Sequence, residues 1–316
     1  MDASISIDRI REAAEVIDPV FLDTPQFVCE PLSGRIGVTT LLKVESVNPI
    51  RSFKGRGTDY LLDRLGVDRR GIVCASAGNF GQGMAYACRK RSRPLTVFGA
   101  RTANPLKVER MRALGATVRL EGDDFDEAKE AAKRHAQEND ELYIEDGMLG
   151  AIGEGAGTIA AELMTNGESL HAVFVPLGNG SLVNGIGTWF KRFSPTTRMV
   201  AVCADAAPSM ALSWRAHKPV IAPSTTIADG IAVRVPVAEA VGLMAGTVDE
   251  VMLVSDQEMK AAMRALFADA GLAVEPAGAA GLAAIIQRAE EFEGKRVATP
   301  LTGGNLTEQQ ARDWLF

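Results

Sequence analysis

Hydrophobic and polar positions alternate with two different periods along most of this chain, so that short β-rich runs are followed by helical runs. Ile7, Ile10 and Ala13 recur at helical spacing and predict a helix over residues 7–16. Strands are predicted at 41–44, 71–75, 95–99, 117–120, 142–144, 172–175, 199–203 and 296–301. Helices are predicted at 57–65, 80–90, 105–114, 125–137, 156–164, 256–268 and from 307, and residues 25–31 form a linker-like entry.

Strands that alternate with helices of this length are typical of an α/β protein with mainly parallel sheets. Local signals support several boundaries: Asn104 and Pro105 are typical of a helix start, and Ser255 with Glu258 forms a capping-box pattern. Turn-forming residues near 45–52 and 145–155 indicate a division into two lobes. We expect residues 50–150 to form a small domain, and residues 1–49 and 151–316 to form a large one.

Composition and charge narrow the class of partner. The chain has 316 residues, 47% of them hydrophobic, and a net charge of −6 with scattered basic residues, which argues against nucleic acid. No apolar run approaches the ~18 residues of a membrane span, and the start lacks an apolar export segment, so a cytoplasmic protein with a small-molecule partner is expected. The four cysteines lie far apart and are interpreted as buried free thiols, and the three isolated histidines give no metal site.

The segment Ser52-Phe53-Lys54-Gly55-Arg56-Gly57 places a lysine where a strand-like run gives way to a helix-like run. A packed wall around the lysine stem and the positive end of a helix both favour the neutral, nucleophilic amine. Such an amine can form a Schiff base with an aldehyde. A lysine beside glycines is also an ordinary solvated loop residue, so the segment gains meaning only from the motifs that follow it.

Three glycine-bearing loops each follow a predicted strand: residues 76–83 (SAGNFGQG), 178–181 (GNGS) and 302–305 (TGGN). Small side chains let backbone N–H groups approach an anion, and a following helix start favours a carboxylate or phosphate. Loops at the carboxyl ends of parallel strands gather on one side of the sheet, where such proteins bind ligands. We therefore expect the three loops and Lys54 to meet at one site.

Nucleotide-binding motifs are incomplete in this chain. The pattern GxGxxG fails after Gly178 and Gly180 because Val183 takes the third glycine position. It fails again after Gly153 and Gly155, since Thr158 stands where the last glycine would be. There is no GxxxxGK[ST] loop either. These absences argue against a dehydrogenase and against a nucleoside triphosphatase.

The motifs SVNPIRSFKGRG, SAGNFGQG, PLGNGSLVNG, TIADGIAVRVP, VEPAGAAGLAA and LTGGN, in this order, resemble those of the fold-type II pyridoxal phosphate enzymes. The serine/threonine dehydratase (ammonia-lyase) group is the most similar. The resemblance implies a fold of the tryptophan synthase β-subunit type, with two lobes that each hold a mainly parallel twisted sheet flanked by helices. It also implies pyridoxal 5′-phosphate as the cofactor, a cofactor site in the large domain and a homodimer.

The resemblance assigns a role to each motif residue. Lys54 would hold the cofactor, Phe53 would pack near its ring, and Asn79 would bind the ring hydroxyl. Thr302 would meet the ring nitrogen, and Gly230 would lie close to another edge of the ring. The cofactor phosphate would lie on the backbone of Gly178, Asn179, Gly180, Ser181 and Leu182. The substrate carboxylate would be bound by Ser76, Ala77 and Gly78. Glu275 is either the family's glutamate near the ring nitrogen or an ordinary acidic residue at a helix start.

The implied activity is elimination of the β-hydroxyl of an L-serine- or L-threonine-type amino acid, giving a 2-oxo acid and ammonia. A neutral hydroxyl at Thr302 makes the ring a moderate electron sink, which favours elimination over transamination. The alternatives are β-replacement or threonine synthase chemistry, 3-hydroxyaspartate ammonia-lyase activity, and a cofactor-binding module without catalysis.

Departures from the family pattern bear on specificity. The phosphate loop, four glycines in most dehydratases, here includes Asn179 and Ser181. Relatives that racemise serine commonly have a serine at the position of Ala77, so weak racemisation is expected. Arg51 replaces a small residue before the SFK run. It is either a surface or interlobe arginine or a partner for an acidic substrate such as 3-hydroxyaspartate.

Overall fold

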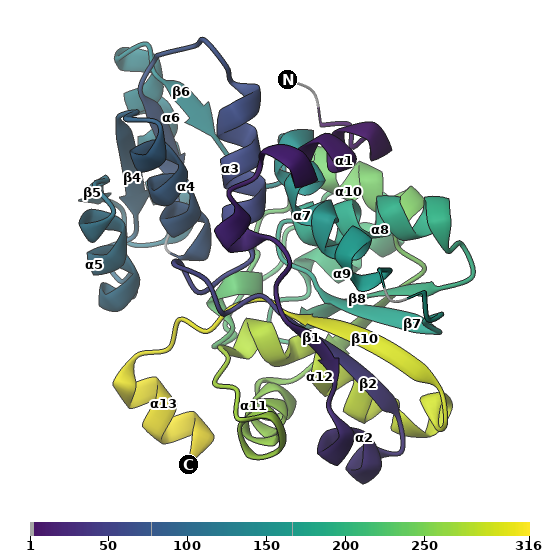
Figure 1. Ribbon diagram of the computed structural model, residues 1–316. Coiled ribbons are helices and arrows are strands. Elements are labelled where there is room, and N and C mark those ends of the chain that lie inside the picture. The colour runs from purple at the N-terminus through teal and green to yellow at the C-terminus, as the bar shows by residue number, and fades with distance from the viewer. Residues whose placement is uncertain (1–2, 77, 166) are drawn as a thin grey trace.

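Two separate sheets form the framework of the protein. The computed structural model describes residues 3–76, 78–165 and 167–316, so that Ala77, one of the predicted carboxylate-binding residues, lies outside the described residues. Figure 1 shows the smaller sheet with its helices on one side of the molecule and the larger sheet on the other. The predicted α/β class, with two mainly parallel sheets flanked by helices, is confirmed.

The larger sheet has six strands in the order β1-β2-β10-β7-β8-β9, and only β1 is antiparallel to its neighbour. The central strands of this sheet, β7 and β8, are buried on both faces, which explains their nearly continuous apolar sequence. The strands are β1 (Gln26–Val28), β2 (Thr39–Val44), β7 (Ala172–Pro176), β8 (Arg198–Ala204), β9 (Glu250–Val254) and β10 (Arg296–Leu301).

The smaller sheet has four strands, all parallel, in the order β5-β4-β3-β6. Its strands are β3 (Ile72–Ala75), β4 (Leu95–Gly99), β5 (Thr117–Leu120) and β6 (Leu142–Ile144). All four come from residues 72–144, within the range expected for the small domain. The division of the chain at residues 50 and 150 into two domains stays a prediction.

Helices cover both faces of each sheet (Figure 1). Those around the larger sheet are α2 (Glu30–Ile36), α7 (Gly150–Leu163), α8 (Ser181–Phe193), α9 (Ser209–Ala216), α10 (Ala238–Thr247), α11 (Asp256–Ala270), α12 (Pro276–Gln287) and α13 (Glu308–Leu315). Those around the smaller sheet are α3 (Lys54–Arg64), α4 (Asn79–Lys90), α5 (Pro105–Ala113) and α6 (Phe125–Glu138). The remaining helical elements are α1 (Ile7–Val16), η1 (Pro19–Phe21), η2 (Asp229–Ile231) and η3 (Ala289–Phe292).

Glycines let α3 pack closely against α7. A Cβ atom at Gly57 would collide with the carbonyl oxygen of Ile152, and one at Gly155 would lie 2.5 Å from the carbonyl oxygen of Arg56. Gly153 and Gly155 belong to the incomplete GxGxxG pattern noted in the sequence, and in the structure they serve close packing. This close approach fixes α3, whose first residue is Lys54, against the larger lobe.

The local prediction was wrong in three regions. The linker-like entry at residues 25–31 contains β1 and the start of α2, with Pro31 in the first helical turn, where proline is tolerated. Helix α7 begins at Gly150 rather than 156, because packing outweighs the poor helix propensity of its glycines. The elements α9, α10 and β9 were not predicted.

Side-chain burial and charge agree with the composition. All four cysteines are free and buried, and burial raises the pKa of Cys88 and of Cys203 to about 12.

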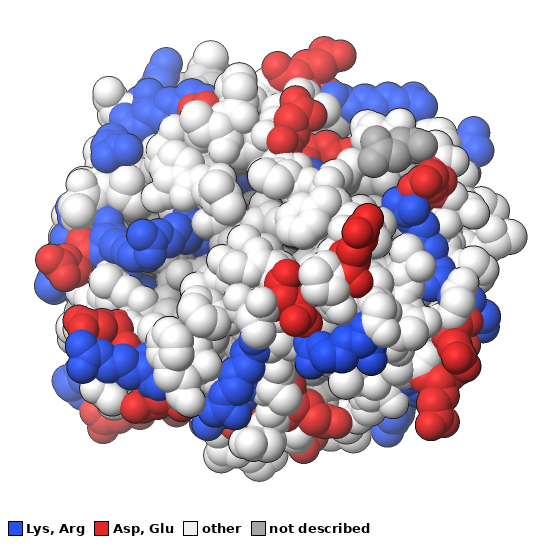
Figure 2. Space-filling model, turned by 60° about the horizontal axis from the view of Figure 1, so that its bottom comes forward, with Lys and Arg blue, Asp and Glu red and all other residues white. Residues whose placement is uncertain are grey.

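Figure 2 shows acidic and basic side chains interspersed over one face rather than gathered in a stripe. Among the described residues, no helix is long and apolar enough to cross a membrane.

Candidate active site

A cavity of about 440 Å³ lies at the carboxyl ends of strands from both sheets. The residues just after β3, β6, β7 and β10 all contribute to its wall, as expected for parallel sheets. The predicted site residues that line it are Phe53, Lys54, Ser76, Gly78, Asn79, Gly178, Asn179, Gly180, Ser181, Leu182, Gly230, Glu275 and Thr302. The structure thus brings together motifs that are almost 250 residues apart in the sequence.

Lys54 is the first residue of α3, and its amine faces the cavity. Its side chain is only 14% exposed, and Nζ lies 4.6 Å from the centre of the Phe53 ring. Nζ also donates a hydrogen bond of 2.5 Å to Oδ2 of Asp146, a residue just after β6. The amine is therefore held in an ion pair beside the ring of Phe53.

The loop after β7 is built to receive an anion. Gly180 has a φ of +96°, which turns the chain into α8. Within the described part of the chain, the backbone N–H groups of Gly178, Asn179 and Gly180 donate to no protein acceptor. The first N–H groups of a helix also lack partners within the helix. Together these groups form a positively polarised nest beside the cavity.

The third glycine loop is hydrogen-bonded to the lysine segment. The backbone N–H of Phe53 donates to the carbonyl of Thr302 at 3.1 Å, and Ser52 forms an isolated bridge with Gly303. Gly304 N–H donates to the carbonyl of Arg51 at 3.0 Å. These bonds place the Thr302 side chain in the cavity beside Lys54.

Asn79 and Glu275 form a buried polar group on the cavity wall. The Asn79 amide donates to Oε1 of Glu275, and Asn305 Nδ2 donates to Oδ1 of Asn79 at 2.8 Å. Lys107 Nζ lies 3.5 Å from Oε2 of Glu275. Burial raises the pKa of Glu275, although the charge of Lys107 opposes this rise. A protonated or ion-paired Glu275 thus fixes the orientation of Asn79.

The family model described as "Pyridoxal-phosphate dependent enzyme" matches residues 17–303 of this chain. The chain belongs to this family of pyridoxal phosphate enzymes. Its cofactor is therefore pyridoxal phosphate, as predicted from the sequence.

Several relatives in the family are similar over nearly the whole chain. An L-threonine ammonia-lyase of Thermotoga maritima is 34% identical over 305 residues, which are 96% of this chain and 76% of the relative. A biosynthetic L-threonine dehydratase of Lactococcus lactis is 33% identical over 311 residues, 95% of this chain and 75% of the relative. The solved structure of the processed form of threonine deaminase isoform 2 from Solanum lycopersicum superposes with a TM-score of 0.88 at 28% identity and covers 99% of this chain and 94% of that one.

The cavity fits pyridoxal phosphate. An amine at Lys54 can hold the cofactor's aldehyde carbon, the N–H nest at Gly178–Gly180 suits a phosphate dianion, and Thr302 offers a hydroxyl. A side chain at Gly178 would lie 2.7 Å from the carbonyl oxygen of Gly230, so a glycine at position 178 permits the close approach of these two backbone segments. These observations support the roles that the sequence resemblance implies for this family, which stay proposals.

The predicted carboxylate loop lies on the same cavity. Oγ of Ser76 accepts hydrogen bonds from the backbone N–H of Gly78 at 3.2 Å and of Gly81 at 2.8 Å, which fixes the start of α4. A Cβ at Gly78 would be 3.7 Å from Lys107 Nζ. The Lys107 ammonium thus lies next to the segment predicted to bind the substrate carboxylate.

Arg51 behaves as a surface residue in this structure. It is exposed, has a φ of +50°, and is not one of the described residues that line the cavity. The alternative in which it pairs with an acidic substrate finds no support in its position, and the interpretation as a surface or interlobe arginine is favoured.

Sequence reasoning missed Asp146, Lys107 and Asp229. Lys107 Nζ is 2.6 Å from Oδ2 of Asp229, and the charges of Glu275 and Asp229 outweigh burial and raise the pKa of Lys107. A signal for Asp146 was present, because it lies two residues after a predicted strand of the same parallel sheet as the first glycine loop. Lys107 had no such signal, since it lies in a helix where four of nine residues are charged, as is ordinary for a solvated helix.

Proposed function

We propose that this protein is an ammonia-lyase that eliminates the β-hydroxyl of an L-serine- or L-threonine-type amino acid, giving a 2-oxo acid and ammonia. The observation that carries the proposal is the convergence of Lys54, the phosphate nest, Asn79 and the neutral hydroxyl of Thr302 on one cavity. The relatives named as L-threonine dehydratase and L-threonine ammonia-lyase support this choice of reaction.

Lys54 has two tasks in the proposed reaction. Its amine binds the cofactor covalently, and once an amino acid has displaced it, the free amine removes the substrate's α-proton. Bound pyridoxal phosphate supplies the electron sink that makes this proton acidic. The side chain of Lys54 is only 14% exposed, so its amine is directed into the cavity rather than into the surrounding solvent.

Other residues orient the reactants. The N–H groups of residues 178–182 would hold the phosphate, and the Asn79 amide would bind the ring hydroxyl. Thr302 would offer the ring nitrogen a hydroxyl, which cannot hold a proton there as a carboxylate would. The backbone around Ser76 and Gly78 binds the substrate carboxylate, next to the positive charge of Lys107.

An end-product assay tests the proposal. Purified, cofactor-loaded protein is incubated with L-serine, L-threonine or 3-hydroxyaspartate, and the 2-oxo acid and ammonia are measured. Borohydride reduction followed by peptide mapping should label Lys54, and Lys54→Ala should abolish both labelling and turnover. A sample labelled at Lys54 that produces no 2-oxo acid from any β-hydroxy amino acid would reject the function. Addition of sulfide distinguishes elimination from β-replacement.

The assembly is proposed from the family resemblance, and the location from the sequence expectation given above. We expect a cytoplasmic homodimer, and multi-angle light scattering of the purified protein together with fractionation of the source cells would test both expectations.

A further inference from the structure

Asn305 supports the cavity residue Asn79 from behind. Asn305 is 1% exposed and lies in the loop after β10, outside the described lining of the cavity. Its Nδ2 donates to Oδ1 of Asn79 at 2.8 Å and to the carbonyl of Ile50 at 2.9 Å. Its Oδ1 accepts a hydrogen bond from the guanidinium of Arg110 on α5. One buried amide thus joins α4, α5 and the segment that leads to Lys54.

The chemistry of two partners fixes the orientation of the Asn305 amide. A guanidinium can only donate hydrogen bonds, so the atom of Asn305 next to Arg110 must be the amide oxygen. A backbone carbonyl can only accept, so the atom next to the Ile50 carbonyl must be the amide nitrogen. The opposite orientation would place oxygen against oxygen and donor against donor. Asn305 therefore has one permitted orientation.

This orientation determines which way Asn79 faces. Asn305 approaches Asn79 with a donor, so the atom of Asn79 that meets it must be the amide oxygen. Gln82 Nε2 donates to the same oxygen at the longer distance of 3.4 Å. The Asn79 nitrogen then faces the other way and donates to Oε1 of Glu275. Gly303 leaves room for this pair, since a Cβ there would collide with Glu275 and lie 3.0 Å from Asn79 Nδ2.

One N–H of Asn79 remains for the cavity. An amide nitrogen carries two hydrogens, and within the part of the chain that the structure describes, Nδ2 of Asn79 donates only to Glu275. Asn79 lines the cavity, so its second N–H is available to a group that binds there. This point of the wall therefore offers a donor, which suits an ionised oxygen better than a hydroxyl that must itself donate.

We propose that Asn305 is a positioning residue, which makes Asn79 present an N–H and not an oxygen to the ring oxygen of pyridoxal phosphate. The proposal rests on the cofactor contact proposed above for Asn79, and it does not depend on which amino acid is the substrate. A hydrogen bond to the charged form of a group favours that form, so this N–H favours the ionised ring oxygen. Asn305 itself touches no cofactor atom and acts through Asn79.

Asn305→Asp tests the orientation, because it keeps the size of the side chain and removes its N–H groups. A carboxylate at this position still accepts from Arg110 but repels Oδ1 of Asn79, so the Asn79 amide turns its oxygen toward the cavity. Burial raises the pKa of Glu275, and a protonated Glu275 can donate to the turned amide. Affinity for pyridoxal phosphate should fall about tenfold in a fluorescence titration of the cofactor-free protein. Unchanged affinity would overturn the proposal.

A double-mutant cycle separates this role from a general loss of structure. Asn79→Ala should weaken cofactor binding about tenfold, and the further change Asn305→Asp should then cost less than about twofold, because the amide that it orients is gone. An equal effect of Asn305→Asp in both backgrounds would overturn the proposal. Wild-type affinity in Asn79→Ala would reject the cofactor contact of Asn79 itself. No substrate is present, so failure of the proposed elimination reaction would leave this test intact.

Absorbance of the fully loaded protein gives a second readout. A protonated ring oxygen absorbs at shorter wavelength than an ionised one, so Asn305→Asp should lower the visible absorbance relative to the near-ultraviolet absorbance at a fixed pH. A merely structural role of Asn305 would leave this ratio unchanged once the cofactor is bound. The same ratio in the wild type and the variant would therefore overturn the proposal.

Two Arg110 variants carry the test if Asn305→Asp does not fold. Arg110→Lys keeps a donor beside Oδ1 of Asn305 and should bind the cofactor as the wild type does. Arg110→Glu places an acceptor there and should weaken cofactor binding several-fold. Arg112→Glu, at an exposed position of the same helix, is the matched control for the added negative charge and should leave affinity unchanged. Equal affinities of Arg110→Lys and Arg110→Glu would overturn the proposal.

Discussion

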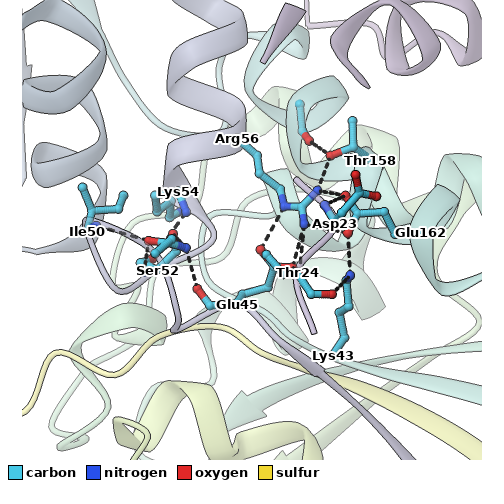
Figure 3. Close-up of polar contacts among 12 residues, drawn as sticks. Asp23, Thr24, Lys43, Glu45, Ile50, Ser52, Lys54, Arg56, Thr158 and Glu162 are labelled. Carbon is cyan, nitrogen blue, oxygen red and sulfur yellow. Dashed lines mark hydrogen bonds and ion pairs between the residues drawn. The ribbon is translucent and has the colours of Figure 1, made fainter. Parts of the chain in front are cut away.

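Arg56 and Glu45 form an ion pair in which neither side chain has any exposed surface. Nε of Arg56 donates to Oε2 of Glu45 at 2.9 Å, and Nη2 donates to Oε1 at 2.9 Å. The same guanidinium donates to Thr158 at 2.9 Å and to Glu162 at 2.5 Å (Figure 3). Burial alone would lower the pKa of Arg56, but the charges and hydrogen bonds of Glu45 and Glu162 together outweigh it and raise the pKa. Because Arg56 follows Lys54 by two residues, this network fixes the turn of α3 that presents the amine.

Arg56→Ala should therefore destabilise the protein strongly. Removal of the guanidinium leaves two carboxylates without their main partner in the interior, and breaking a buried pair in this way costs about 3–5 kcal/mol. The free energy of unfolding from urea titration measures the loss. Arg69→Ala, at an exposed position just after α3, is the control and should change stability by less than about 0.5 kcal/mol. A loss at Arg56 as small as that at Arg69 would contradict the role of the network.

Local sequence signals were sufficient for much of the fold. The strands at 95–99 and 117–120 have the predicted bounds, because the first is an apolar run, the second has β-branched residues at its start, and both are followed by turn residues. Asn104 accepts a hydrogen bond from Leu106 N–H at 3.0 Å, and the capping box of Ser255 with Glu258 is present. Each of these features depends on residues within a few positions of one another.

Contacts between distant residues could not be predicted in the same way. Arg56 and Glu162 are 106 residues apart, and the packing of α3 against α7 brings them together. Lys54 and Asp146 are 92 residues apart and meet because Asp146 follows β6 of the smaller sheet. The family resemblance placed the cofactor residues on one cavity, but it contained no information on Asp146. A polar residue after a strand end is ambiguous until the neighbouring strand is known.

The stability of the buried network should depend on pH through Glu162. Burial alone would raise the pKa of Glu162, but hydrogen bonds and charge from Arg56, with help from Lys43, lower it below its usual value of 4.5. A carboxyl with a lowered pKa in the folded state stabilises the protein above its unfolded pKa, and this contribution disappears as the pH falls through the folded pKa. Glu162→Gln should thus be less stable than the wild type at pH 7. The difference in the free energy of unfolding between the two proteins should become smaller below about pH 4.5.

Urea titrations of wild type and Glu162→Gln across pH 7 to 3 measure this gap. The wild-type curve should fall more steeply on the acidic side, because only the wild type must take up a proton at this site. A gap that stays constant across the whole range would show that the ionised carboxylate does not contribute to stability.

Gly180→Ala should weaken cofactor binding. The residue has a φ of +96°, a conformation that is strained for alanine, and its Cβ would lie 3.0 Å from the Cβ of Ala240. Alanine in this conformation costs about 1–2 kcal/mol, and the loop can relieve this strain by moving away from the position that binds the phosphate. We therefore expect roughly tenfold weaker binding of pyridoxal phosphate. Equilibrium dialysis of the cofactor-free protein measures the dissociation constant.

Gly242→Ala on α10 is the matched control. This glycine is exposed, and a Cβ there would meet nothing within 4 Å, so the helix should gain slightly in stability while cofactor affinity stays the same. Equal affinities for the wild type and Gly180→Ala would contradict the placement of the phosphate on this loop.

Arg51→Ala should affect acidic and neutral substrates alike. Arg51 is exposed and lies outside the described cavity lining, so we expect its guanidinium not to contact a substrate side chain. Its backbone carbonyl accepts a hydrogen bond from Gly304 N–H at 3.0 Å, a contact that alanine keeps. We expect the same small change in kcat/KM for L-threonine and for 3-hydroxyaspartate, measured with one enzyme batch. If 3-hydroxyaspartate turnover alone fell tenfold or more, the loss of about 1.4 kcal/mol would mean that Arg51 reaches the bound substrate.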